Sequence, residues 1–424
     1  MICRFPSPCS RSIPSCIVGL VLLALSWTTS AATADELERF LDRHELDAVL
    51  AMYLERQLET QTGKARDETI ERLSALYVDL LGEVTDGGER RRLEGRVRDL
   101  LQEAPESAAD ELRLALLRGP YRRAEETAER WRLRLVDGEA ATEASRTLAD
   151  IIPKLLTLRD AFQSRLDSLT DEEGRVSAQM SRELQTRVER LRRLHQQSTF
   201  LAAWASYYKA WLDDQPARAE LARNLFAELL DPELDRLSPE QVSRDLRELE
   251  YYARCILGTA LCAAMTGPAE RALDWLELLE VEETNPTIRA QVPIWHLVLL
   301  LEDQRFSDAR RYARSLIDRG DLVNPAWLRL IAVYALLDNG RRAGSSELAR
   351  FALAELAAQA ELEQVLSLAE QFGLETLDAE GFAMRYVQGV LLYQRVREAH
   401  DSEFPAAERD LIDQYAEAEA ALTA

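Results

Sequence analysis

The four histidines of the chain are the first residues to consider for metal binding or acid–base chemistry. His44, His195, His296 and His400 are widely separated, and none has a second metal ligand at helical spacing. His44 is followed by Glu45, but the second histidine of a zinc-protease helix is absent. His296 stands in an apolar run, so we interpret it as a hydrogen-bonded core histidine. The sequence therefore predicts no metal site.

Other catalytic signatures are missing as well. The chain has no glycine-rich phosphate loop and no Gly-x-Ser-x-Gly elbow. Carboxylates are so numerous that pairs arise by chance, and paired-acid glycosidase chemistry cannot be inferred from them. Trp204, Tyr208 and Trp211 share a helix face, with Tyr207 beside them, which favours core packing over a sugar platform. We predict a protein without catalytic residues or cofactors, and not an enzyme.

Composition predicts an all-α fold. Of 424 residues, 47% are apolar and 30% are charged, which is typical of a globular chain. Leu, Ala, Glu and Arg dominate and are good helix formers, and no alternating stretch reads as a strand. The net charge of −22 opposes phosphate backbones and anionic lipid, so nucleic acid is not expected as a partner.

Residues 1–34 resemble a secretory signal peptide. Arg4 and Arg11 precede an apolar segment, 16–27, that is too short to span a bilayer comfortably, and Ala32-Thr33-Ala34 offers small residues for cleavage. We expect export to the periplasm or the medium, with no stable membrane insertion after cleavage. An uncleaved signal acting as a membrane anchor is the alternative.

Two cysteines, Cys255 and Cys262, lie beyond that segment. They are seven residues apart in an expected helix, or about 10.5 Å along its axis. That separation exceeds the Cα distance of a disulfide, so we expect both to be buried, unpaired thiols.

The pattern of breaks predicts three regions after the signal: helical hairpins over 35–150, a long antiparallel helix pair over 151–199, and a repeat region over 200–424. An acidic helix over 406–422 would cap the last region. Gly119-Pro120 is expected to separate two helices, and one helix is expected from Ser238-Pro239 to Met265.

The clearest hairpin covers residues 325–359. Asn324 can cap its first helix, Pro325 suits the first turn, and Asn339-Gly340 breaks the run. Trp327 and Tyr334 fall on one face of that helix. Ala343 is a small residue near the start of the second helix, where two helices could approach closely. A hairpin of this kind cannot bury its apolar faces alone and requires stacked neighbours.

These residues resemble the tetratricopeptide repeat in a degenerate form. The matching positions are Trp327, Leu330, Tyr334 and Ala343, with Phe306, Ala309 and Ala313 in the preceding unit and Gly258 for the family's helix glycine. The resemblance implies an α-α superhelix, a right-handed solenoid of helical hairpins, in which first helices line a concave groove.

The resemblance also implies which side chains line that groove. Each of them is apolar, so the groove either takes an apolar partner segment or is filled by other helices of the chain. The implied lining residues are Ile294, Val298, Leu301, Leu328, Ala332, Ala335 and Leu336.

The resulting hypothesis is an exported, non-catalytic scaffold or adaptor that binds another protein or a peptide segment. A secreted α/α-toroid enzyme acting on polysaccharide or cell-envelope material is the alternative. A structural homodimer through residues 150–200 is a third hypothesis.

Overall fold

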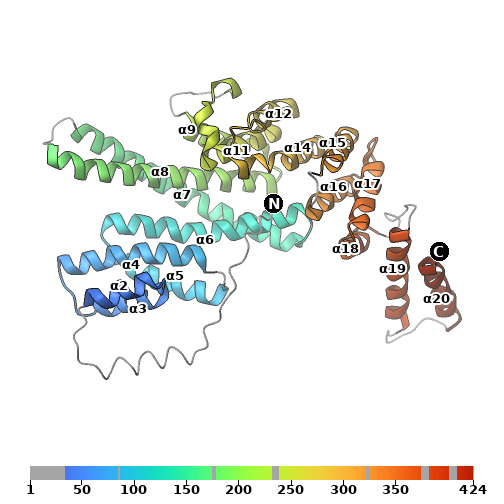
Figure 1. The fold of residues 1–424 in the computed structure, drawn as a ribbon, viewed down its shortest axis with the longest axis horizontal. Helices are drawn as coiled ribbons and strands as arrows, with labels where there is room; N and C mark the ends of the chain where they lie inside the picture. The colour runs from blue at the N-terminus through green and yellow to red at the C-terminus, as the bar shows by residue number, and fades with distance from the viewer. Residues whose placement is uncertain are drawn as a thin grey trace. The chain divides into compact units, whose positions relative to one another are not determined.

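The computed structural model describes residues 34–84, 86–173, 178–231, 238–320, 324–373, 382–400 and 408–423 (Figure 1). Within these ranges the regular elements are helices, and no β-strand occurs, which confirms the all-α prediction. The expected signal peptide lies outside the described residues, apart from Ala34, which begins the first described helix.

The chain forms two compact units. The described residues of unit 1 fall within 34–124 and 149–201, and those of unit 2 within 125–148 and 202–423. Three long helices run through the boundary: α6 (Glu106–Arg132), α7 (Gly138–Glu173) and α8 (Ala178–Leu212). The expected division at 150 and 199 falls inside α7 and α8, and the three-region scheme stays a prediction.

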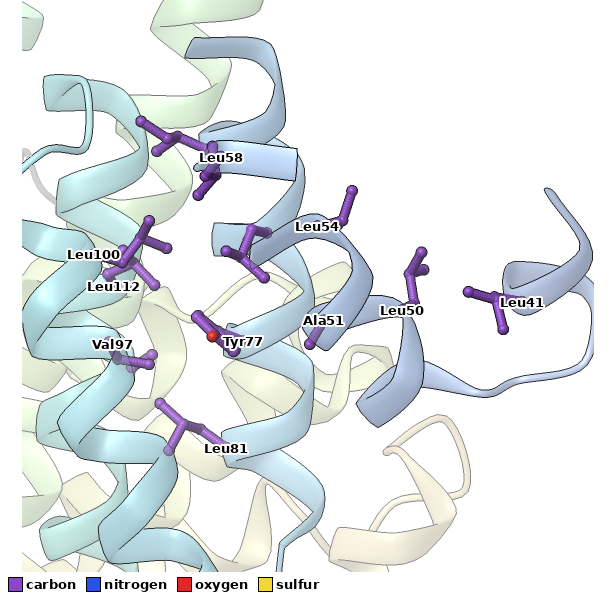
Figure 2. Close-up of a cluster of buried hydrophobic side chains, with 13 residues drawn as sticks. Leu41, Leu50, Ala51, Leu54, Leu58, Tyr77, Leu81, Val97, Leu100 and Leu112 are labelled. Atoms are coloured by element: carbon purple, nitrogen blue, oxygen red, sulfur yellow. The ribbon is translucent and has the colours of Figure 1, made fainter. Parts of the chain in front are cut away.

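Unit 1 is built around one apolar cluster. Its own helices are α2 (Ala34–Arg43), α3 (Asp47–Leu58), α4 (Lys64–Glu83) and α5 (Gly87–Leu101). Figure 2 shows Leu54 and Leu58 of α3 with Tyr77 and Leu81 of α4, and Val97 of α5 lies in the same cluster. The 3.6-residue spacing of these side chains puts them on one face of each helix, so burial of that face holds the unit together.

Unit 2 contains the remaining helices: α9 (Pro216–Leu230), the 3-10 turn η1 (Pro239–Gln241), α10 (Arg244–Glu248), α11 (Glu250–Thr266), α12 (Ala269–Glu277), α13 (Pro286–Arg289), α14 (Val292–Glu302), α15 (Phe306–Asp318), α16 (Pro325–Asp338), α17 (Ser345–Ala358), α18 (Leu362–Phe372), α19 (Phe382–His400) and α20 (Glu408–Thr423). From α14 onward each helix packs against its neighbour along the chain or the next helix but one. Thus α14 contacts both α15 and α16, and α17 contacts α15, α16, α18 and α19. The acidic α20 packs on α19.

One turn recurs between successive helices. A non-glycine residue with φ between 51° and 62° ends the first helix, and the next residue donates its N–H to the carbonyl five positions back. This hydrogen bond is the one that defines a Schellman C-cap. In four of the five cases the following helix starts two residues later. The left-handed residues are Glu45, Arg134, Asp214, Gln304 and Ala360.

The structure confirms the expected start of α16, and two further helices begin with a similar cap. The side chain of Asn324 accepts the N–H of Ala326 at 3.0 Å, with Pro325 in the first turn of α16. Asp86 and Asp137 cap α5 and α7 in the same manner, accepting from Glu89 and Ala140. A carboxylate or amide oxygen at this position satisfies an N–H that the helix itself leaves open.

Three expectations were wrong. Gly119-Pro120 does not break the chain, because α6 continues through it with Leu112 and Ala115 buried before the proline and Tyr121 and Ala124 buried after it. Burial of this continuous face outweighs the backbone hydrogen bond that proline cannot make.

The expected helix from 238 to 265 is instead three elements, η1, α10 and α11, because Val242, Ser243 and Leu249 take extended conformations. Ala343 lies exposed in the turn before α17 rather than at a close helix contact. The close approach falls one residue later, at Gly344, where an added Cβ would lie 2.6 Å from Ser307 Oγ.

Gly258 lies at the tightest contact between α11 and α9. A Cβ at this position would stand 2.4 Å from the Phe226 ring, and Phe226 is fully buried. We expect Gly258→Ala to lower the free energy of unfolding by about 1–3 kcal/mol, because a packed ring has no room to withdraw. Urea denaturation measures this. Adding Phe226→Leu should recover part of the loss, and a strictly additive double variant would contradict the contact.

Ala360 tests the recurrent turn. Glycine has no steric penalty at positive φ, so Ala360→Gly should stabilise the protein by about 0.5–1 kcal/mol after its larger chain entropy is deducted. Ala358 is equally exposed but right-handed at the end of α17, so Ala358→Gly should destabilise by about 0.5–1 kcal/mol. Opposite signs in thermal unfolding are expected, and equal signs would refute the role of the turn.

Candidate interaction site in unit 2

No group of three or more His, Cys, Asp or Glu side chains in the described residues is placed to hold a metal ion. His296 is only half buried, stacks on Tyr312 at 4.3 Å and faces Glu280 at 3.8 Å. Burial lowers its pKa, since the charged imidazole loses water. His296 is therefore a packed side chain at the edge of the core.

The two cysteines are as expected. Cys255 and Cys262 are free and fully buried in α11. Burial raises the pKa of both thiols, because a thiolate would be poorly solvated there. They serve as small apolar residues. In addition, none of the helices in the described ranges has the length and apolar character needed to span a bilayer.

The aromatic residues of α8 also lie where the sequence predicted. Trp204, Tyr207 and Tyr208 are buried, and the Trp204 ring meets Tyr207 and Phe226 edge to face at 5.7 and 5.3 Å. Trp211, the fourth aromatic residue of the predicted set, is partly exposed. These rings form core rather than an exposed platform.

The predicted groove residues are covered. Ile294, Val298 and Leu301 on α14 are buried, as are Leu328, Ala332 and Ala335 on α16, and Leu336 is partly buried. In this structure they contribute to the packing of α14 and α16 against each other and their neighbours. Their role toward a partner stays a prediction.

Unit 2 holds a segment of the chain that lies far in sequence from helices α14 to α18. This resident segment, residues 125–135, is the end of α6 and the turn that follows it. Arg254 of α11 lies 3.6 Å from the Glu125 carboxylate, and the Tyr208 hydroxyl donates to Glu129 at 2.9 Å. Helices α8 and α11 therefore contribute polar contacts to it, and contacts from α14 and α16 are described next.

Arg132 is the centre of these contacts and is 4% exposed. Its Nη2 donates to the Tyr207 hydroxyl at 2.9 Å, and Nη1 lies 3.6 Å from the Glu302 carboxylate of α14. The guanidinium stands over the rings of Trp211 and Trp295, at 4.4 and 5.0 Å from their centroids. Arginine is suited to such a place because its planar cation stacks on aromatic faces and is more weakly hydrated than an ammonium group.

Glu302 of α14 links Arg132 to helix α16. Its Oε1 accepts from Trp211 Nε1 at 3.2 Å and from the Tyr334 hydroxyl of α16 at 3.0 Å. Burial, followed by the Glu302 charge, raises the pKa of Tyr334, so this hydroxyl remains a neutral donor. Burial alone would lower the pKa of Arg132. The Tyr207 and Tyr334 hydroxyls and the Glu129 and Glu302 carboxylates raise it, so the guanidinium keeps its charge.

Arg329 of α16 holds the end of the resident segment. It is 2% exposed, and its Nε donates to the Leu133 carbonyl at 3.0 Å. Its other nitrogens donate to the Gln364 carbonyl and the Ser367 hydroxyl of α18, each at 3.3 Å. Burial lowers the pKa of Arg329, because these acceptors are neutral. One buried side chain thus joins the segment to α16 and α18.

The sequence alone did not identify these residues. Arg329 carries a signal, since it is the only charged residue in the apolar run from Pro325 to Leu337. Arg132 carries none, because it stands among other arginines and glutamates in a segment that reads as a solvated helix. Its partners come from three distant parts of the chain.

No protein-family model matches the chain, and no curated protein matches it in sequence. The fold is all-α, and its many helices packed in sequence-adjacent pairs are compatible with a helical repeat.

Removal of Arg132 should be strongly destabilising. Arg132→Ala leaves Glu129 and Glu302 close together without their cation, so we expect a loss of about 3–5 kcal/mol in the free energy of unfolding. Tryptophan fluorescence during urea denaturation measures it. Arg130→Ala on the exposed side of the same helix turn is the control and should change stability by less than about 0.5 kcal/mol. Equal effects of the two variants would contradict the role of Arg132.

Proposed function

We propose that this protein is an exported helical-repeat scaffold or adaptor, without catalytic activity, that binds another protein or a peptide segment. In this proposal the helix pairs from α14 onward form a right-handed solenoid similar to tetratricopeptide repeats. The contacts of each helix with its neighbour and the next helix but one support such an arrangement. The recurrent left-handed turn supports it too.

The observation that carries the proposal is the resident segment. Unit 2 binds a helical stretch of its own chain through a buried arginine, paired carboxylates and aromatic side chains. These are the residue types that anchor protein–protein interfaces. Surfaces of stacked helical hairpins that accommodate one helix in this manner are suited to binding helices of other proteins.

Export is part of the proposal and rests on residues 1–34 of the sequence. An exported protein with two buried thiols depends on its apolar core for stability, and the extensive burial in both units supplies this.

Affinity capture of the tagged protein from the exported fraction, followed by mass spectrometry and sedimentation, tests the function. We expect one partner protein in a stoichiometric complex. A monomer with no partner would contradict the scaffold and would redirect work to the α/α-toroid alternative through a glycan and peptide substrate screen.

A further inference from the structure

A second surface, in unit 1, has the form of a helix-binding groove. Helix α4 packs against both α3 and α5. Above it lie two hollows of about 440 and 500 Å³, and both have Tyr77 and Arg96 in their walls. The two hollows adjoin at these residues along the same three helices, and we call the pair of hollows the α3–α5 groove. Figure 2 shows Tyr77 on α4, between the sides formed by α3 and α5.

The walls of the groove are regular helix faces. Residues from α3 recur at intervals of three and four, and those from α5 do the same over about 18 Å of helix axis. That length matches a partner helix of three turns or more. The lining residues of α3 and its C-cap are Ala48, Ala51, Met52, Glu55, Leu58 and Glu59, and those of α5 are Glu89, Arg92, Leu93, Arg96, Asp99 and Leu100.

One half of the groove exposes apolar side chains. Met52 is 59% exposed, and Leu80, Val84 and Leu93 are partly exposed around it. An unbranched thioether adapts to many shapes, so methionine is common on surfaces that bind amphipathic helices. The floor beneath is firm, since Tyr77 is buried and its hydroxyl donates to Glu55.

The rim of the groove is acidic. Seven carboxylates line the two hollows against three arginines, which gives a net charge of −4. Two of the arginines are already paired across the groove, Arg96 with Glu55 at 3.3 Å and Arg66 with Glu103. An occupant with positive charge on its flanks would meet complementary potential along the whole rim, whereas an acidic one would be repelled.

We propose that the α3–α5 groove docks a basic amphipathic helix of a partner protein. Its apolar side chains, spaced i, i+3, i+4 and i+7, lie on Met52, Leu80 and Leu93, and its lysines or arginines face the acidic rim. This inference adds to the proposed scaffold function a defined surface in unit 1 and the chemistry of its partner. It does not depend on the resident segment of unit 2.

A synthetic 18-residue peptide of leucine and lysine, with leucine at i, i+3, i+4 and i+7, is the probe. Fluorescence anisotropy of the labelled peptide with the purified protein should give saturable binding that weakens with salt. A peptide of the same composition with scrambled order, and a leucine–glutamate peptide with the same stripe, should bind at least about tenfold more weakly. Equal binding of the striped and scrambled peptides would overturn the proposal.

Variants locate the binding. Met52→Lys should weaken binding of the lysine peptide at least about tenfold, since it removes an apolar contact and adds charge repulsion. Leu249→Lys, at a similarly exposed position in unit 2, is the control and should have no effect. The double variant Glu83→Lys and Asp99→Lys should weaken binding of the lysine peptide and strengthen binding of the glutamate peptide. Both lie in last turns of helices, where a cation suits the helix dipole and folding is preserved.

Two further outcomes would also refute the proposal. One is peptide binding unchanged by Met52→Lys, and the other is a dimeric protein that becomes monomeric in Met52→Lys, since the occupant would then be a second copy. The test is separate from the capture experiment. If a stoichiometric partner is captured but the peptide does not bind, the scaffold function is supported and the α3–α5 groove is refuted as a docking site.

Discussion

Helices α14 and α16 of unit 2 have buried side chains on more than one face, and their need for cover organises the packing around them. In α14, eight of the eleven residues are buried, and in α16 the six consecutive residues from Leu328 to Val333 are buried. A helix that is apolar almost all round cannot lie at a surface, so it needs neighbours on several sides. The hairpin partners α15 and α17 supply some of that cover, and the adjacent helices α12 and α18 supply more.

Two buried arginines hold the resident segment in unit 2. Arg132 and Arg329 are almost completely excluded from water, and an unpaired charge at such depth costs several kcal/mol. Each is matched by partners fixed in position: the Tyr207 hydroxyl and the Glu302 carboxylate for Arg132, and carbonyl and hydroxyl oxygens for Arg329. The stack of helices and the resident segment are in this way tied into one structure, since displacement of either would leave a cation without partners.

Each unit has a surface suited to contact with a helix, and among the described residues only the surface of unit 2 is covered by a segment of the chain itself. Unit 2 surrounds a helical segment of its own chain with aromatic rings and ion pairs. The α3–α5 groove of unit 1 has helix-spaced walls, exposed apolar side chains and an acidic rim. Under the proposed function, the chemistry of each surface limits which partner helices can bind.

The sequence by itself determined the all-α fold, the apolar face of most helices and several helix starts, because these depend on side chains close together in the chain. Leu54, Tyr77 and Val97 lie in the core as their spacing requires, and Asn324 caps α16 as its position before Pro325 requires.

Tertiary structure alone decided the rest. Pro120 lies inside a continuous helix because burial on both sides of it is worth more than one backbone hydrogen bond. Ala360 and Gln304 adopt left-handed conformations that their own preferences oppose, since hairpin packing stabilises the turn. Arg132 is buried although its local sequence is that of a solvated surface. Its partners Tyr207, Glu302 and Tyr334 are 75 or more positions away. Only the fold brings such residues together, because a local sequence pattern carries no information about partners so far away in the chain.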